Sequence, residues 1–186
     1  MKRPFLFFIF GSMKYWLSVL FITCGLISYA QTTFNGELQI YPTGLIPGLR
    51  IENQISDKTK IHLRVGLNLF DHRDLGEQDE ERGWGYGFTL GFSRQLKTSR
   101  FALGFRNDFW FNNVDWTDNT STPSPISGET DITVLQPTVE LTYSLKTEKL
   151  SIRPSIAFGS EWNVRTEGRP TGEGPNILIG IIVGGL

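Results

Sequence analysis

The sequence predicts an all-β protein, and three observations support this prediction. After Gln31, apolar and polar residues alternate with a period of two along most of the chain, as they do in strands with two unlike faces. The chain has fourteen Phe, five Trp, five Tyr and twenty Gly, which suits pleated strands better than a helical bundle. Polar connections of alternating length separate the alternating segments. We therefore expect an antiparallel meander.

The alternation defines eight expected strands. The clearest is residues 60–70, where Ile61, Leu63 and Val65 lie on one face and His62 and Arg64 on the other. The complete set is residues 33–41, 49–55, 60–70, 84–93, 100–112, 133–145, 150–162 and 176–186.

The connections between these strands alternate in length. Tight polar turns are expected at residues 56–59, 96–99 and 146–149, and long polar loops at 71–83, 113–131 and 163–174, whereas 42–48 is intermediate. In an antiparallel meander every second connection lies at the same end. The tight turns therefore share one end and the long loops the other. Outer-membrane barrels have this asymmetry.

Residues 1–30 have the pattern of a signal peptide. They contain no Asp or Glu, and Lys14 precedes an apolar run that ends in Ser28-Tyr29-Ala30. We predict cleavage after Ala30, which leaves one domain of residues 31–186. Met13 begins a complete signal by itself, so it is an alternative start. An uncleaved membrane anchor is the other interpretation of the apolar run.

The volume of the apolar face decides which way that face points. An eight-stranded barrel has an interior just wide enough for its own side chains. The apolar face carries too many bulky residues for that space, whereas the opposite face mixes small residues with a few long charged groups. We therefore predict an eight-stranded antiparallel up-and-down transmembrane β-barrel with its apolar face toward lipid. Aromatic residues near the strand ends are expected at the two membrane interfaces: Trp84, Tyr86, Phe92, Phe101, Phe109, Phe111, Tyr143 and Trp162, with Trp110 beside them.

These features together resemble the small eight-stranded outer-membrane barrels of Gram-negative bacteria, the OmpA/OmpX-like transmembrane domains. The resemblance is architectural, covers nearly all of residues 31–186, and implies a location in the outer membrane. Members of that class usually end on an aromatic residue, whereas this chain ends on Leu186, and the facing of its last strand stays open. Pro137 and Pro154 fall on the lipid-facing parity, where we expect bulges. Asn53 and Asn107 share that parity, which allows a local slip in register.

The inward face is expected to hold a network of acids and arginines. Unpaired charges in a lumen shielded from water cost several kcal/mol each, so arginine–carboxylate pairing is expected. A filled polar plug is the main interpretation, and a gated ion path is the alternative. The predicted members are Glu37, Arg50, Glu52, Arg64, Arg100, Arg106, Asp108, Glu140, Arg153 and Glu161.

The long loops supply candidate binding residues. The loop 71–83 is strongly acidic, but it lacks the ligand spacing of a calcium loop, and we expect neither a metal site nor a cofactor. The loop 113–131 is expected to be flexible with an exposed Trp116. The external binding candidates are Asp74, Glu77, Asp79, Glu80 and Trp116. The glycines of residues 83–91 indicate packing in a narrow lumen, since no helix follows to make a phosphate loop.

The leading functional hypothesis is a non-enzymatic surface protein that acts through its external loops. Its expected partners are outer-membrane lipid, lipopolysaccharide and the barrel-insertion machinery. It is expected to be a monomer, and the near balance of 19 acidic and 18 basic residues argues against nucleic acid. One alternative is a lipopolysaccharide-modifying acyl-ester hydrolase or transferase, for which His72 is the candidate base. Another is a soluble exported barrel that binds a small apolar ligand.

Overall fold

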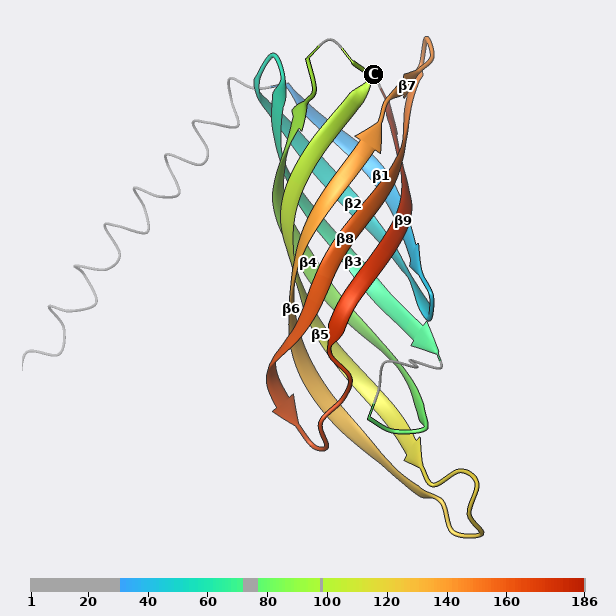
Figure 1. The fold of residues 1–186 in the computed structure, drawn as a ribbon. Helices are drawn as coiled ribbons and strands as arrows, with labels where there is room; N and C mark the ends of the chain where they lie inside the picture. The colour runs from blue at the N-terminus through green and yellow to red at the C-terminus, as the bar shows by residue number, and fades with distance from the viewer. Residues whose placement is uncertain (1–30, 72–76, 98, 186) are drawn as a thin grey trace, which may run out of the picture.

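The computed structural model of the protein describes residues 31–71, 77–97 and 99–185, whose regular elements are all strands (Figure 1). The strands are β1 (Thr32–Tyr41), β2 (Gly44–Ser56), β3 (Thr59–Asp71), β4 (Glu80–Gln95), β5 (Phe101–Asp118), β6 (Ile126–Tyr143), β7 (Leu145–Lys146), β8 (Leu150–Glu167) and β9 (Gly174–Gly185). Within these residues no helix is long and apolar enough to cross a membrane. The predicted signal segment, residues 1–30, lies outside the described residues.

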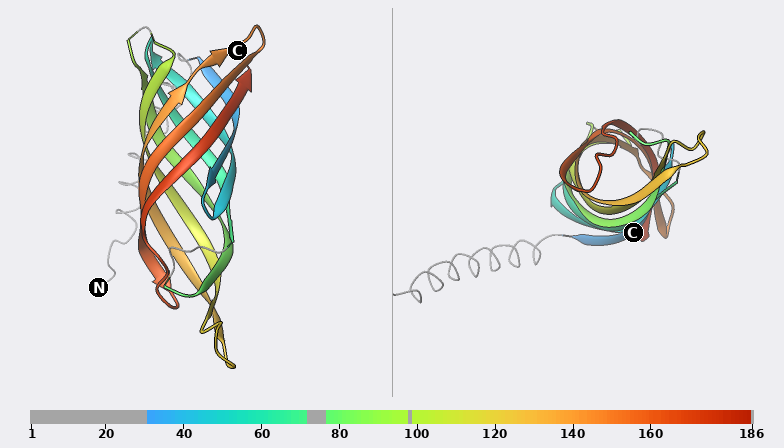
Figure 2. Two further views of the ribbon diagram at one scale, coloured as in Figure 1. Left: turned by 45° about the vertical axis from the view of Figure 1, so that its right-hand side comes forward. Right: turned by 90° about the horizontal axis from the view of Figure 1, so that it is seen from below.

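The strands close into a barrel of antiparallel neighbours. The sheet order is β6-β5-β4-β3-β2-β1-β9-β8-β7, and β6 also pairs with β8, which completes the ring (Figure 2). The two-residue strand β7 pairs with β8 in the register that β6 uses, so β6 and β7 are two parts of one strand of the wall. The wall therefore has eight strands, as the sequence predicts.

The two faces of the wall have the predicted orientation. Along β3 the side chains of Leu63 and Val65 are exposed, whereas His62 and Arg64 are buried. The same alternation runs along the other strands, so the exterior of the wall is apolar and the interior is mostly polar. The interior also holds a buried apolar cluster that includes Phe70, Val114 and Ile132. The predicted alternative of an apolar ligand inside the barrel is wrong, because buried charged side chains occupy the centre of the interior. The structure also determines which residues of the last strand, β9, face the interior. Leu178 and Ile182 point inward, and Ile179 points outward.

The longest predicted loop, residues 113–131, consists mostly of strand residues in the structure. β5 and β6 form a hairpin that projects beyond the other strands (Figure 1), and only residues 119–125 connect them. Trp116 therefore lies within β5, is 7% exposed, and donates from Nε1 to Oγ1 of Thr130 at 3.1 Å. The prediction of an exposed loop aromatic at Trp116 is wrong, because the inward face of this strand continues past the predicted boundary. β8 likewise extends to Glu167.

No bulge forms at Pro137, contrary to the prediction. The pairs on either side of it, Leu135 with Trp162 and Thr138 with Gly159, keep one register, and the β6–β8 ladder is interrupted between them. The missing N–H of proline is thus accommodated by a gap in the ladder, without an inserted residue. The described register shifts fall elsewhere, in β2–β3 between Gln54 and Ser56 and in β6–β8 between Thr133 and Val134.

Pro154 behaves in the same way. It pairs with Ile181 of β9 in an unshifted register. On the side that faces β6 and β7, the pairing is interrupted between the pairs Thr142–Ser155 and Leu145–Ile152. This interruption separates β6 from β7. The predicted bulge is therefore absent here too.

Inward-facing glycines of β4 make room for large side chains of the neighbouring strands. A β-carbon at Gly87 would lie 2.5 Å from Cε3 of Trp110, and one at Gly91 would lie 2.6 Å from ring atoms of His62 and from Cβ of Arg106. Such distances are closer than van der Waals contact allows. The glycine-rich stretch therefore serves interior packing, as predicted.

Substituting Gly91 with alanine is expected to destabilise the barrel. The added methyl group meets His62 and the stem of Arg106, and overpacking of this kind costs about 1–3 kcal/mol. The matched control is Gly36→Ala, since a β-carbon at Gly36 has only the Val183 carbonyl oxygen at 3.9 Å. Urea unfolding in lipid vesicles measures both variants. Equal stability of Gly91→Ala and Gly36→Ala contradicts the packing argument.

Candidate functional site

The centre of the lumen is held by one carboxylate that serves three arginines. The carboxylate of Glu37, in β1, forms ion pairs with three guanidinium groups. The N–O distances are 3.2 Å to Arg50 of β2, 3.0 Å to Arg64 of β3 and 3.4 Å to Arg106 of β5. Nε2 of Gln39 donates to the same carboxylate at 2.6 Å. The three guanidinium groups are about 1% exposed. Four strands are thus joined at a site that solvent does not reach.

Two further carboxylates complete the centre of this network. Asp108 binds Arg64 at 2.8 Å and Arg106 at 3.2 Å, and Glu140 binds Arg50 at 3.1 Å and Arg106 at 2.8 Å. Each of the three arginines therefore contacts at least two carboxylates. Such multiple pairing offsets the desolvation cost of burying charge, which a single pair often fails to do.

The fourth carboxylate, Glu52, extends the network toward the tight-turn end. It binds Arg50 at 2.9 Å, Arg153 at 2.8 Å and Lys60 at 3.2 Å. The network thus spans β1, β2, β3, β5, β6 and β8. It fills the centre of the lumen, and buried apolar side chains such as Phe70, Trp110 and Val114 pack inside the wall toward the loop end. Both kinds of filling favour a plug over an ion path.

Two of the predicted network residues lie apart from it. Arg100 is exposed at the tight-turn mouth, because it precedes β5 where the lumen opens to solvent, so its predicted place in the buried interior is wrong. Glu161 is buried toward the loop end, where its Oε1 accepts from Nδ2 of Asn176 at 3.2 Å. His62 is buried on the inward face, where the sequence predicts an interior histidine, and its Nδ1 lies 3.1 Å from Nη2 of Arg50. Because guanidinium only donates, this nitrogen is the acceptor.

Trp110 faces the lumen and not the membrane interface. It is buried, donates from Nε1 to Oε1 of Gln136 at 3.3 Å, and lies with its ring centroid 5.5 Å from Cζ of Arg64. Its parity in β5 is opposite to that of Phe109 and Phe111, so the earlier placement beside them is wrong.

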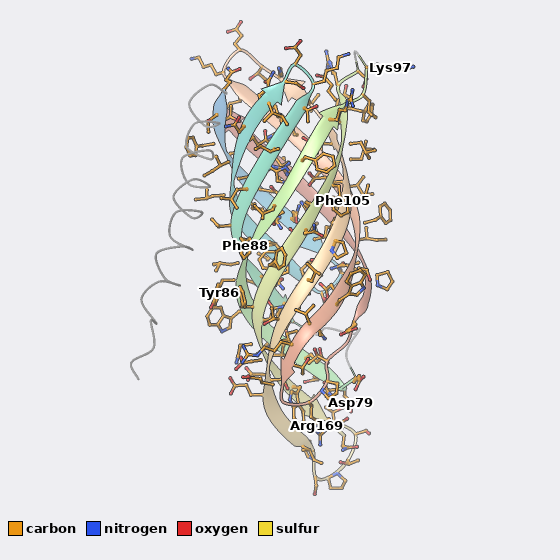
Figure 3. The ribbon with its side chains drawn as sticks, turned by 90° about the vertical axis from the view of Figure 1, so that its left-hand side faces the viewer. Asp79, Tyr86, Phe88, Lys97, Phe105 and Arg169 are labelled. Atoms are coloured by element: carbon orange, nitrogen blue, oxygen red, sulfur yellow. The ribbon has the colours of Figure 1, made fainter. Side chains whose placement is uncertain are left out.

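The predicted interface aromatics lie on the outer face of the wall (Figure 3). Several form directly opposed cross-strand pairs, with ring centroids 5.5 Å apart for Tyr86 and Phe111 and 4.8 Å apart for Phe101 and Tyr143. The side chains of Trp84, Tyr86, Phe92, Phe101, Phe111 and Trp162 are exposed, and those of Phe109 and Tyr143 are half-buried. Aromatic pairs of this kind stabilise neighbouring strands.

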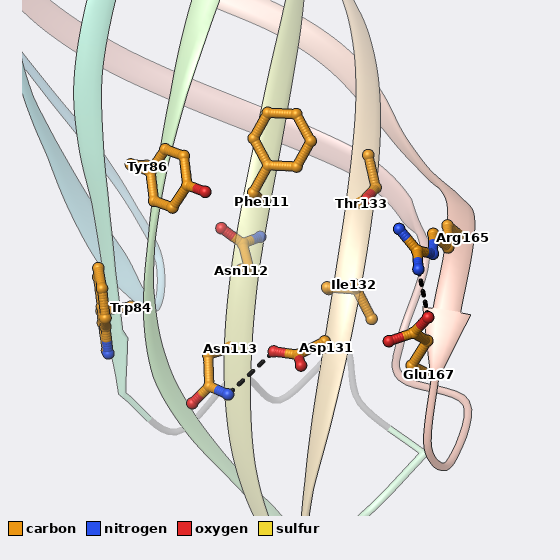
Figure 4. A pocket seen from close by; sticks show the side chains of 10 residues that line it. All are labelled: Trp84, Tyr86, Phe111, Asn112, Asn113, Asp131, Ile132, Thr133, Arg165 and Glu167. Atoms are coloured by element: carbon orange, nitrogen blue, oxygen red, sulfur yellow. Dashed lines mark hydrogen bonds and ion pairs between the residues drawn. The ribbon is translucent and has the colours of Figure 1, made fainter.

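A shallow groove of about 320 Å³ marks the outer wall where the aromatic surface meets the loop end (Figure 4). Trp84, Tyr86 and Phe111 line one part of it, and Asp131 and Arg165 line another. Arg165 faces outward because the register shift in the β6–β8 ladder pairs it with Thr133, and bulges re-aim side chains in this way. The groove therefore joins an apolar surface to a polar one.

The loops at the far end bind one another. Oδ2 of Asp79 accepts from N and Oγ1 of Thr120 at 2.9 and 3.0 Å, which ties the β3–β4 connection to the long hairpin. Arg169 lies with Cζ 4.4 Å from the ring centroid of Trp116 and pairs with Asp118 at 3.4 Å. Glu77 and Glu80 are exposed. The candidates His72 and Asp74 lie outside the described residues.

The two mouths of the barrel carry opposite charge. The basic residues Lys58, Lys60, Arg94, Lys97, Arg100, Lys146 and Lys149 lie at the tight-turn end, against Asp57 and Glu148. At the loop end the described basic residues Arg82, Arg165 and Arg169 are outnumbered by the acidic residues Asp71, Glu77, Asp79, Glu80, Glu81, Asp115, Asp118, Glu129, Asp131, Glu161, Glu167 and Glu173. Across the described ranges, no three His, Cys, Asp or Glu side chains gather in an arrangement that would hold a metal ion.

Comparison with known proteins identifies the class of fold. No protein-family model and no curated protein matches the sequence. A major outer membrane protein from Thermus thermophilus superposes with a TM-score of 0.52 at 13% identity, over 82% of this chain and 98% of that one. The N-terminal β-barrel domain of Pseudomonas aeruginosa OprF gives 0.46 at 11% identity, over 83% and 98%. Neisserial surface protein A gives 0.47 at 7%, over 82% and 94%.

The protein therefore has the fold of a small outer-membrane β-barrel. The closed eight-stranded wall and the superposition on the Thermus protein carry this assignment. The resemblance seen in the sequence is confirmed at the level of fold.

Replacing Glu37 with glutamine is expected to destabilise the barrel strongly. The substitution keeps the side-chain volume but leaves Arg50, Arg64 and Arg106 with one negative charge fewer. Breaking a buried ion network in this way costs about 3–5 kcal/mol. Urea unfolding in lipid vesicles measures the loss, with Glu148→Gln in an exposed turn as the control. An unfolding free energy equal to that of the control shows that the network contributes nothing.

Proposed function

We propose that the protein is an integral outer-membrane protein of a Gram-negative bacterium that anchors through its barrel and binds at the cell surface through its loop end. The observation that carries this proposal is the inverted arrangement of the wall. Phe34 and Leu49 are 73% and 67% exposed, while charged side chains fill the inside. Exposed apolar residues around the whole wall are costly in water and stable in a lipid bilayer.

Export and insertion follow from the same proposal. The charged start, apolar run and Ser28-Tyr29-Ala30 motif support removal of residues 1–30 by signal peptidase, and the barrel-insertion machinery then places residues 31–186 in the membrane. We propose a monomer, because the ring of strands is closed and leaves no wall edge for pairing with another copy.

Membrane lipid, including lipopolysaccharide, is the proposed partner of the outer wall. The groove beside Trp84, Tyr86 and Phe111 supports this, since its apolar part suits acyl chains. Arg165 lines the same groove, where it pairs with Glu167, and is the group that would meet a headgroup phosphate.

The loop end is the proposed surface for a soluble or cell-bound partner. Hydrogen bonds between Asp79 and Thr120 hold the β3–β4 connection against the long hairpin, and the contact of Arg169 with Trp116 holds the β8–β9 connection. Carboxylates predominate around these contacts, and Glu77 and Glu80 are free to meet a ligand in their exposed positions. A partner with positive charge fits this surface.

Heat modifiability tests the membrane barrel. Expression with the native signal is expected to deliver the protein to the outer-membrane fraction, and the unboiled protein should migrate differently from the boiled one in a detergent gel. The closed hydrogen-bonded wall resists detergent until it is heated. Recovery in the soluble periplasm, with a single band under both conditions, contradicts the proposal.

Cysteine labelling tests the orientation. Cleavage after Ala30 removes Cys24, the single native cysteine. Any labelling of the mature protein therefore comes from the introduced cysteine. A membrane-impermeant maleimide is expected to label Ser121→Cys on intact cells and Glu148→Cys only after the outer membrane is permeabilised. These positions lie in the loop-end hairpin and in a tight turn, respectively. The reverse pattern places the loop end in the periplasm.

A further inference from the structure

The tight-turn mouth of the lumen opens into a vestibule of about 420 Å³. This volume lies in the range of about 300–1,000 Å³ that small-molecule sites occupy. Its charged lining consists of five cations and one acid: Lys58, Lys60, Arg100, Lys146, Arg153 and Asp57. The remaining lining is mostly uncharged polar, and includes the buried hydroxyl residues Ser93 and Thr142.

The cations reach the mouth from separate strands because the inward parity of the wall continues to the strand ends. Lys60 belongs to β3, Lys146 to β7 and Arg153 to β8, and Arg100 directly precedes β5. Their side chains therefore surround the opening from several strands of the wall.

The carboxylate at the floor of the vestibule does not neutralise this charge. Glu52 is held by Arg50 at 2.9 Å from below and by Lys60 and Arg153 at 3.2 and 2.8 Å from the vestibule side. One carboxylate thus serves three cations, and positive charge remains in excess at the vestibule. Within residues 31–71, 77–97 and 99–185, Lys58, Arg100 and Lys146 make no ion pair.

Two of these residues have their backbone fixed at the mouth. The amide of Ser144 donates to the carbonyl oxygen of Arg100 at 2.8 Å, and the amide of Gln95 donates to that of Lys58 at 2.8 Å. Several cationic donors around one opening favour a ligand with several anionic oxygens. A phosphomonoester supplies three such oxygens and up to two charges, whereas a carboxylate or a phosphodiester supplies two such oxygens and one charge.

We propose that this vestibule binds a phosphate group, with Arg100 and Lys146 at its rim and Lys60 and Arg153 deeper inside. The phosphate is a phosphomonoester, carried either by a lipid headgroup at the barrel edge or by a soluble phosphorylated compound. In the orientation proposed above the vestibule faces the periplasm. The binding itself does not depend on that orientation, and purified protein tests it separately.

The experiment is a titration of the isotope-labelled barrel, followed through the amide NMR signals of Arg100, Ser144 and Lys146. One arm adds inorganic pyrophosphate to the barrel in an uncharged detergent. The other compares phosphatidylcholine nanodiscs with and without phosphatidic acid, whose headgroup is a phosphomonoester. Saturable shifts at the tight-turn mouth, with Thr120 at the loop end unchanged, are expected in at least one arm. Shifts with pyrophosphate identify a soluble ligand, and shifts only with phosphatidic acid identify a headgroup.

The test variant is the double substitution Arg100→Gln with Lys146→Gln, which leaves the buried network intact. Loss of two charged donors is expected to weaken the apparent affinity at least about fivefold. The matched control is Arg94→Gln with Lys149→Gln, which removes the same charge at the same end from exposed residues outside the vestibule lining. The control is expected to change the affinity less than about twofold, through long-range charge alone.

Two results overturn the proposal. One is the absence of saturable shifts at the mouth in both arms. The other is an equal loss of affinity in the test and control variants, which shows that the end attracts anions by its overall charge without a site.

Discussion

The structure depends on the closure of one hydrogen-bonded ladder, between β1 and β9. Their register runs from Asn35 opposite Gly184 to Ile40 opposite Ile179, and it joins the first strand of the chain to the last. A sheet with open edges leaves backbone N–H and C=O groups that lipid cannot satisfy, so an apolar wall is stable in a membrane only when the ring is complete. Closure with eight strands also fixes how narrow the interior is.

That narrow interior determines what its residues are. Bulky inward residues are tolerated where the neighbouring strand offers glycine, as Trp110 is beside Gly87 and His62 beside Gly91. Toward the loop end, apolar side chains such as Val114 and Ile132 fill the remaining space. The centre is filled by arginines and carboxylates, whose long side chains cross the lumen and meet residues from the opposite wall. Glu37 illustrates this, since it contacts arginines of three other strands. Packing and charge pairing thus act as one constraint, and a register slip of one residue would disrupt both.

The sequence predicted the strands, their facing and most of the charge network, because a two-residue period and the limited volume of the lumen leave few alternatives. It misplaced Trp116 because the apolar residues of β5 change face after Phe111. Val114 and Trp116 point inward and Asp115 points outward, so the alternation changes phase before the strand ends. Hydrogen bonds such as that from Asn113 to Asp131 join outward-facing polar side chains of the hairpin there. It misplaced Arg100 because the alternation does not mark where the lumen opens to solvent. The β8 register shift was also hidden, since neither proline marks it.

The balanced network at the centre allows the two ends to differ. Arg50, Arg64, Arg106 and Arg153 meet the same number of carboxylates, so the central network carries little net charge of its own. The acidic loop end and the basic turn end are then separated by a filled lumen and lie in solvent, where salt screens charges beyond about 10 Å. Each end can therefore change its charge with little effect on the stability of the wall. Binding at one end is for the same reason electrostatically independent of binding at the other.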